Sequence, residues 1–186
     1  MSLNQEKMIN IIMDRKSYRG KYKDIKVPRE DLVKVMQAGL AAPSGCNKQT
    51  TSLIAVDEPT ILQELKQLIH PPICETAPAI ICVLTQRITA YRNKCYSIQD
   101  YSAAIENMLI AIKALGYESC WYEGHITDDD NIALKLAQKL KVPNNYELVC
   151  ILPVGYAKEE VSRVKKKQFD ERAWFNSFMN KAERET

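Results

Sequence analysis

Apolar side chains recur at helical spacing in several separate stretches of the chain. This spacing predicts helices over residues 5–14, from Pro28 to near Pro43, from Pro59 to Ile69, from Asp128 to about Leu140, and from Asp170 to Met179. The clearest pattern begins at Asp100, a good N-cap residue, and ends at Gly116, a good helix stop. This helix is apolar nearly all round, which indicates burial at the domain centre or under a second subunit and favours a dimer.

Four shorter runs have the composition of strands. They are Thr51–Val56, Ala79–Leu84, Tyr117–Tyr122 and Leu148–Val154. Because helices and strands interleave without internal repeats, we expect an α/β or α+β fold with one central sheet and helices on both faces. Residues 86–98 are polar, carry tyrosines and could form a lid.

Length and composition narrow the class of protein. With 186 residues, 46% of them hydrophobic and 26% charged, the chain fits one globular domain. No apolar run approaches the ~20 residues of a membrane span, and a net charge of +3 is too mild to imply a nucleic-acid partner. Six cysteines without a CxxC pair, together with two histidines, give no metal-binding spacing. We therefore expect a reduced, cytoplasmic protein that binds neither membrane nor nucleic acid.

Several common enzyme motifs are absent. The sequence has no GxGxxG after a strand, no GxxxxGK[ST], no HExxH and no GxSxG. Neither His70 nor His125 has a nucleophile nearby in sequence. Hydrolase chemistry and a Rossmann-type nicotinamide site are therefore disfavoured.

Two clusters of polar residues are candidates for binding. Arg15, Ser17 and Arg19 alternate after the first predicted helix, and two guanidiniums beside a hydroxyl suit a phosphate, although a solvated basic turn explains them too. A second cluster, Ser44, Asn47 and Gln49, follows Pro43. Its amide and hydroxyl groups could bind the edge of a polar heterocycle, but turn formation explains Ser and Asn equally well.

Taken in order, these segments resemble the FMN-dependent nitroreductase family. The resemblance rests on residues 15–19 (RKSYR), 42–49 (APSGCNKQ), 100–109 (DYSAAIENML), 114–116 (ALG), 121–124 (WYEG) and 152–156 (LPVGY), followed by a basic arm. It spans nearly the whole chain. Each motif is weak alone, but together in this order they are fairly specific.

The resemblance implies a three-layer α+β fold with a mixed or antiparallel sheet, in an obligate homodimer with FMN at the subunit interface. Residues 1–186 would form a single domain, with a C-terminal basic arm and helix over about 156–186. The cofactor-binding residues it implies are Arg15, Lys16, Ser17, Arg19, Pro43, Ser44, Asn47, Gln49, Glu123, Gly124, Lys165 and Lys166, with Arg163 also in reach. No catalytic side chain and no metal is expected, because the flavin performs the chemistry.

The implied activity is transfer of hydride from NADH or NADPH through FMN to a nitroaromatic, a quinone or a similar acceptor, in a ping-pong cycle. A flavoprotein of the same superfamily with another acceptor, such as a dehalogenase or a dehydrogenase, is an alternative. A second alternative is a non-enzymatic binding module that uses the Lys165–Lys167 arm. This second alternative predicts steeply salt-dependent binding to nucleic acid or an acidic partner.

Overall fold

The centre of the fold is an antiparallel sheet. The computed structural model describes residues 3–161 and 164–178. In this part of the chain the strands are β1 (Thr51–Val56), β2 (Ala79–Thr85) and β3 (Glu147–Val154), in the order β1-β2-β3. Both neighbouring pairs are antiparallel. The predicted α+β class with an antiparallel central sheet is confirmed, and three of the four predicted strands are present.

The fourth predicted strand, Tyr117–Tyr122, is wrong. This segment runs beside β3 but makes only isolated bridges, from Glu118 to Gly155 and from Tyr122 to Ile151. Between those bridges, the carbonyl of Ser119 accepts a hydrogen bond from the N–H of Tyr18 at 2.8 Å. The backbone groups of the segment are thus divided between β3 and the N-terminal region, so no continuous ladder forms.

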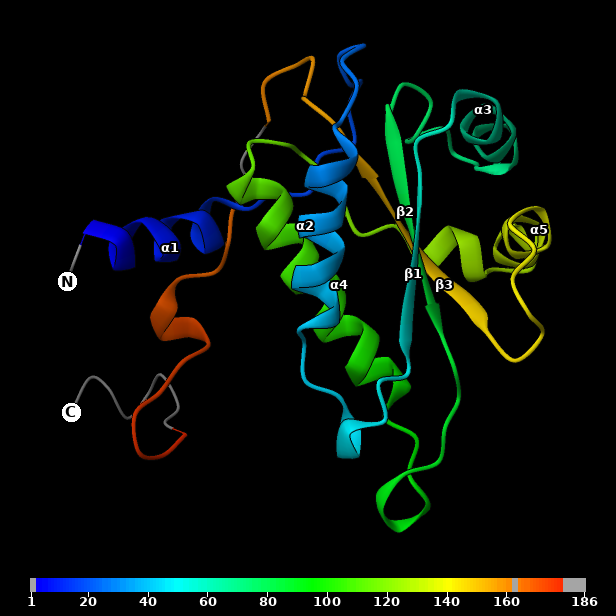
Figure 1. Ribbon diagram of the computed structural model, residues 1–186. Helices are drawn as coiled ribbons and strands as arrows, with labels where there is room; N and C mark the ends of the chain where they lie inside the picture. The colour runs from blue at the N-terminus through cyan, green and yellow to red at the C-terminus, as the bar shows by residue number, and fades with distance from the viewer. Residues whose placement is uncertain (1–2, 162–163, 179–186) are drawn as a thin grey trace.

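Helices cover both faces of the sheet (Figure 1). On one face lie α2 (Arg29–Leu40) and α4 (Ser97–Ala114), and on the other lie α3 (Pro59–Leu68) and α5 (Ile132–Lys139). A hydrophobic core fills each interface; the first includes Leu32, Ile105 and Met108, and the second includes Leu65 and Leu136. Because β2 is covered on both faces, all of its side chains are buried. This burial explains why its sequence is a continuous apolar run.

The long helix α4 begins before its predicted start. Asp100 lies in its first turn rather than at the N-cap, so the N-cap prediction is wrong. The Asp100 carboxylate instead accepts hydrogen bonds from the Gly45 N–H and the Thr50 hydroxyl, each at 2.7 Å. The predicted stop is confirmed, because Gly116 follows the helix with φ 84°, a conformation that glycine adopts without strain.

Both ends of the described chain lie away from the sheet (Figure 1). Helix α1 (Leu3–Asp14) carries five exposed apolar residues, Leu3, Met8, Ile9, Ile12 and Met13. The predicted last helix is wrong over residues 170–178, which hold only the short 3-10 turn η4 (Phe169–Glu171). Trp174 and Phe178 pack on each other instead, with ring centroids 4.1 Å apart. Arg163 and Met179 lie outside the described residues.

Two further segments differ in detail from expectation. Helix α5 begins at Ile132, later than the predicted start at Asp128, because Asn131 has φ 57° and leaves the helical conformation. Residues 86–98 fold into a narrow hairpin, with one bridge between Thr89 and Cys95 and a 3-10 turn, η2 (Tyr91–Asn93), at its tip. None of the described helices is both long and apolar enough to cross a membrane.

Candidate functional site

The basic segment after α1 lies along the outer side of residues 117–122. Tyr18 anchors it, because its side chain is buried and its N–H donates to the Ser119 carbonyl. In an extended segment neighbouring side chains point to opposite sides, so burial of Tyr18 leaves Ser17 and Arg19 exposed. Lys16 donates to the Val161 carbonyl at 2.8 Å and ties the segment to the start of the basic arm.

Nε of Arg15 and Oγ of Ser119 are buried without a hydrogen-bond partner among the described residues, as is the hydroxyl of Tyr22, which packs on Tyr18. Arg15 Nε lies 3.2 Å from a carboxylate oxygen of Glu106, an ionic contact without hydrogen-bond geometry. A buried polar group without a partner costs about 1–3 kcal/mol, so such groups commonly await a ligand or water. Arg15 Nε and Ser119 Oγ fit a polar ligand at this edge of the fold.

The turn that follows this stretch of chain, Glu123–Gly124, presents backbone donors. The Glu123 carboxylate is fixed from two sides, by the Tyr101 hydroxyl at 3.0 Å and the Trp121 indole N–H at 2.6 Å. Burial, followed by this bond to Glu123, raises the pKa of Tyr101 to about 12, which keeps it a hydrogen-bond donor. Within the described chain, the N–H groups of Glu123 and Gly124 donate to no backbone carbonyl. They remain available for a ligand.

A cavity of about 580 Å³ opens directly beside this turn. Its lining includes Tyr101, Glu123, Arg87 and Glu147. Arg87 binds Glu147 through Nε at 2.9 Å and donates to the Ser97 hydroxyl at 2.9 Å, so its charge is already compensated. The size of the cavity suits a small organic molecule.

The loop after α2 holds the second predicted cluster. Three of its residues adopt left-handed backbone conformations, Cys46 at φ 53°, Asn47 at φ 54° and Gln49 at φ 49°. Such conformations cost energy for non-glycine residues and concentrate at functional sites. The Ser44 hydroxyl accepts from the Gln49 N–H at 3.0 Å, which closes the loop and leaves Pro43, Asn47 and Gln49 exposed.

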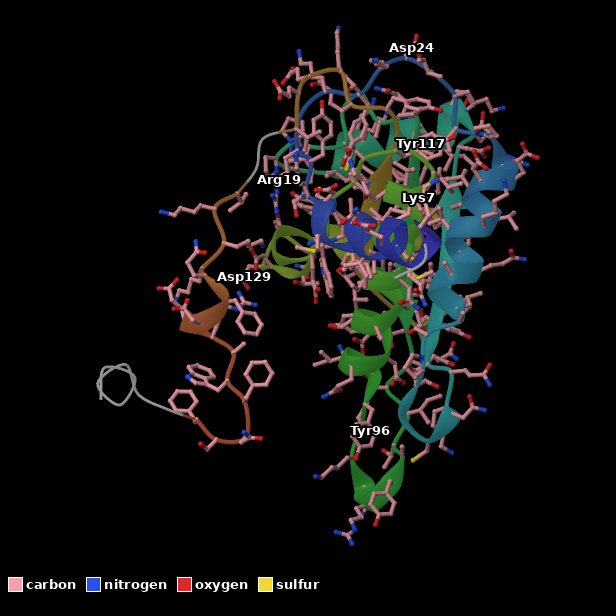
Figure 2. The ribbon with its side chains drawn as sticks, turned by 90° about the vertical axis from the view of Figure 1, so that its left-hand side faces the viewer. Lys7, Arg19, Asp24, Tyr96, Tyr117 and Asp129 are labelled. Carbon is pink, nitrogen blue, oxygen red and sulfur yellow. The ribbon has the colours of Figure 1, made fainter. Side chains whose placement is uncertain are left out.

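The two predicted clusters lie apart within one chain. Residues 15–19 lie near the C-terminal half of α4, whereas the loop, drawn in cyan with η1 (Gly45–Asn47), lies beyond its N-terminal end (Figure 1). Figure 2, turned by 90°, shows the same separation between Arg19 and this loop. The structure thus brings the Arg15–Arg19 segment to Ser119, in the stretch that leads into the Glu123–Gly124 turn, but it does not bring Pro43, Ser44, Asn47 and Gln49 there.

The basic arm is only partly joined to the first cluster. It begins beside residues 15–19, where Lys16 contacts Val161, and then runs away from the sheet in both views. Lys165 and Lys166 are exposed and form no ion pair with a described carboxylate. No group of three or more His, Cys, Asp or Glu side chains that could hold a metal occurs in the described part of the chain.

Comparison with known proteins decides the family. The sequence profile described as "Nitroreductase family" matches residues 12–72 and 63–156, which include both polar clusters and the Glu123–Gly124 turn. The chain belongs to the Nitroreductase family. The resemblance of its motifs to that family is confirmed.

Individual nitroreductase relatives agree with this assignment. A protein of Archaeoglobus fulgidus, provisionally named NADH dehydrogenase/NAD(P)H nitroreductase, is 28% identical over 157 residues, covering 83% of this chain and 88% of its own. The FMN-dependent nitroreductase of Clostridium difficile R20291 is 30% identical at a TM-score of 0.76, covering 91% and 99%. A nitroreductase of Bacteroides fragilis NCTC 9343, solved with bound FMN, is 25% identical at a TM-score of 0.70, covering 93% and 98%. The chain is an oxidoreductase by family.

Sequence reasoning missed two residues of this region. Ser119 lies inside a run that looks like an ordinary strand, so nothing in the local pattern marks its hydroxyl as unpartnered. Asp100 looks like a helix cap, and only the fold shows that its carboxylate fixes the loop at Gly45 and Thr50.

Proposed function

We propose that this nitroreductase is a homodimeric FMN enzyme that transfers hydride from NADH or NADPH to a nitroaromatic or quinone by a ping-pong cycle. One observation carries the proposal. The Tyr18–Ser119 bond holds the Arg15–Arg19 segment against the stretch that leads into the Glu123–Gly124 turn, and Nε of Arg15 and Oγ of Ser119 are buried there without a hydrogen-bond partner among the described residues. When bound, FMN supplies the redox chemistry by accepting hydride and passing electrons on.

The phosphate end of the flavin would be held by cations from both ends of the chain. Arg15 and Ser17 supply a guanidinium and a hydroxyl, and Lys165 or Lys166 supplies an ammonium from the arm. The Lys16–Val161 hydrogen bond supports this grouping, because it fixes the start of the arm beside the N-terminal segment. Guanidinium and ammonium groups are the protein's strongest phosphate donors.

The ring end would be positioned by backbone donors and one permanent cation. Tyr101 and Trp121 hold the Glu123 carboxylate and so orient the turn. In this orientation the N–H groups of Glu123 and Gly124 can face flavin N5. Exposed Arg19 would lie at the N1–O2 edge. Its charge persists at any working pH and stabilises negative charge that develops there on reduction.

A second copy of the chain would complete the site. The loop of Pro43, Ser44, Asn47 and Gln49 lies beyond the N-terminal end of α4, apart from Arg19 in both views, yet it is held in a strained, specific shape. Exposed apolar residues on α1, including Met8 and Met13, together with Leu40 on α2, provide surface for such a partner. Exposed apolar surface of this kind marks interaction sites.

The test is the absorption spectrum of the purified protein with its mass in solution. We expect a yellow dimer with close to one flavin per subunit, bleached by NADH or NADPH under anaerobic conditions. The bleached protein should recover its colour when a quinone or nitroaromatic is added. A colourless protein that takes up no added FMN would refute the proposal.

An enone is a second candidate acceptor. A Lactiplantibacillus plantarum protein named CLA biosynthesis enone reductase is 30% identical over 97 residues, which is 48% of this chain. In this chain, reduction of an enone would use the same flavin and the same site residues as the proposed reaction. Re-oxidation of the bleached protein by an enone faster than by a quinone would favour this acceptor.

A further inference from the structure

The loop that carries Pro43, Ser44, Asn47 and Gln49 is packed against the hairpin formed by residues 86–98. A side-chain carbon added at Gly45 would lie 2.6 Å from Cβ of Tyr96, so glycine is required for this close approach. Asp100 fixes the same junction, because it binds the Gly45 N–H while its own N–H donates to the Tyr96 carbonyl at 2.9 Å. The loop and the base of the hairpin therefore form one rigid unit.

The tip of the hairpin projects beyond this junction and carries positive charge. Both figures show the hairpin, drawn in green, next to the cyan loop at the far end of α4. Arg92 and Asn93 have left-handed backbones at φ 53° and φ 59°, which form a tight turn. The Arg92 guanidinium lies 5.0 Å from the centre of the Tyr91 ring, and this cation–π contact positions it.

No acidic side chain within residues 41–50 or 86–98 offsets the positive charge of the hairpin tip. Residues 41–50 and 86–98 contain four basic residues, Lys48, Arg87, Arg92 and Lys94, and no acidic residue. Arg87 is compensated by Glu147, whereas the other three are exposed and form no ion pair with a described carboxylate. Asp100 at the junction carries one negative charge, because its hydrogen-bond donors, the Gly45 N–H and the Thr50 hydroxyl, are neutral. Three exposed cations against this one buried carboxylate leave the unit with a net positive field.

We infer that Arg92 and Lys94 select an oxidising substrate that carries a negative charge, such as an aromatic or enone carboxylate. The inference rests on the proposed function, in which the loop of one subunit lies against the flavin of the other. The hairpin moves with that loop, so its cations would flank the entrance to the partner's flavin. A field of one sign at an entrance raises the local concentration of oppositely charged substrate.

The test compares a charged and a neutral substrate of equal shape, 4-nitrobenzoate and 4-nitrobenzamide. The double variant Arg92→Gln/Lys94→Gln should lower kcat/KM for 4-nitrobenzoate about five- to tenfold, as expected for two exposed charge pairs. The kcat/KM for 4-nitrobenzamide should stay within about twofold of the wild-type value. The preference of the wild type for 4-nitrobenzoate over 4-nitrobenzamide should shrink at high salt. The control Lys23→Gln/Lys26→Gln removes the same net charge elsewhere and should leave the ratio unchanged.

A binding measurement separates selection from turnover. Calorimetric titration of the flavin-loaded protein should show tighter binding of benzoate than of benzamide, and the hairpin variant should lose that difference. Equal loss for both substrates, or an unchanged ratio in the hairpin variant, would overturn the inference. If flavin content and activity with 4-nitrobenzamide are normal in that case, the proposed function stands and only the charge selection fails.

Discussion

The carboxylate of Asp100 accepts the backbone N–H of Gly45 at 2.7 Å, across 55 positions of sequence. Its second oxygen accepts the Thr50 hydroxyl at 2.7 Å. One buried side chain on α4 thus fixes both ends of the strained loop. A residue that resembles a helix cap in sequence instead determines the shape of a candidate binding loop.

Replacement of Asp100 by Asn should destabilise the protein. An amide has one acceptor oxygen where the carboxylate has two, so the Thr50 hydroxyl must turn from donor to acceptor, and two charge-assisted hydrogen bonds are replaced by neutral ones. We expect a loss of about 1–3 kcal/mol. The melting temperature should fall by roughly 2–4 °C per kcal/mol. The exposed aspartate Asp129, changed to Asn as the control, should have no effect in the same thermal melt.

Loss of the phosphate cations should release flavin. In the double variant Arg15→Ala/Lys166→Ala we expect FMN affinity to fall on the order of 100-fold or more, because each charge-assisted hydrogen bond contributes about 1.5–3 kcal/mol. Fluorescence titration of released FMN measures this. The control Glu106→Gln breaks the ion pair to Arg15 but keeps the guanidinium, so it should retain flavin. Flavin retained in the double variant would show that the clamp is misplaced.

Subunit mixing tests whether two chains build each site. An Arg15→Ala/Lys166→Ala subunit and an Asn47→Ala/Gln49→Ala subunit should each form flavin-poor homodimers. When the two are unfolded together and refolded, a mixed dimer has one site with both sets of changes and one site with none. Flavin content of the tagged mixed dimer should therefore approach one per dimer. No recovery would mean that each site lies within one chain.

Replacement of Ser119 by Ala should stabilise the flavin-free protein and weaken its binding of FMN. Ser119→Ala removes a buried hydroxyl without a described partner, so the flavin-free protein should gain about 1 kcal/mol while FMN affinity falls about two- to tenfold. Thr85→Val is the matched control, since its buried hydroxyl on β2 also lacks a described partner. It should stabilise the protein and leave FMN affinity unchanged. Chemical denaturation and flavin titration measure the two effects.

Stability should fall at alkaline pH. Burial raises the pKa of the Cys120 thiol from 9.0 to about 11, with the positive charge of Arg19 opposing the shift. The unfolded chain loses this proton first, so it binds fewer protons than the folded chain between pH 9 and 11, and stability declines with pH over that window. Urea midpoints across the window should show a shallower decline for Cys120→Ala. An equal slope in both proteins would contradict the assignment.

Local patterns in the sequence were sufficient to predict the strands and helices of the core. The apolar run of β2 and the helical spacing of α4 predict burial correctly, because burial of a continuous or periodic apolar surface depends on neighbours along the chain. The segment 117–122 has the same kind of composition but is not a strand. Its pairing depends on Tyr18, which is distant in sequence and competes for its backbone groups.

The sequence by itself determined the family, the α+β class and the identity of the polar clusters, since motif order and hydrophobic period are local properties. The tertiary structure alone decided which clusters meet. It joined the Arg15–Arg19 segment to Ser119, in the stretch that leads into the Glu123–Gly124 turn, through a backbone bond from Tyr18, and it kept the Ser44–Gln49 loop away, fixed by Asp100. Contacts between residues far apart in sequence depend on how the layers pack, and no local pattern encodes that packing.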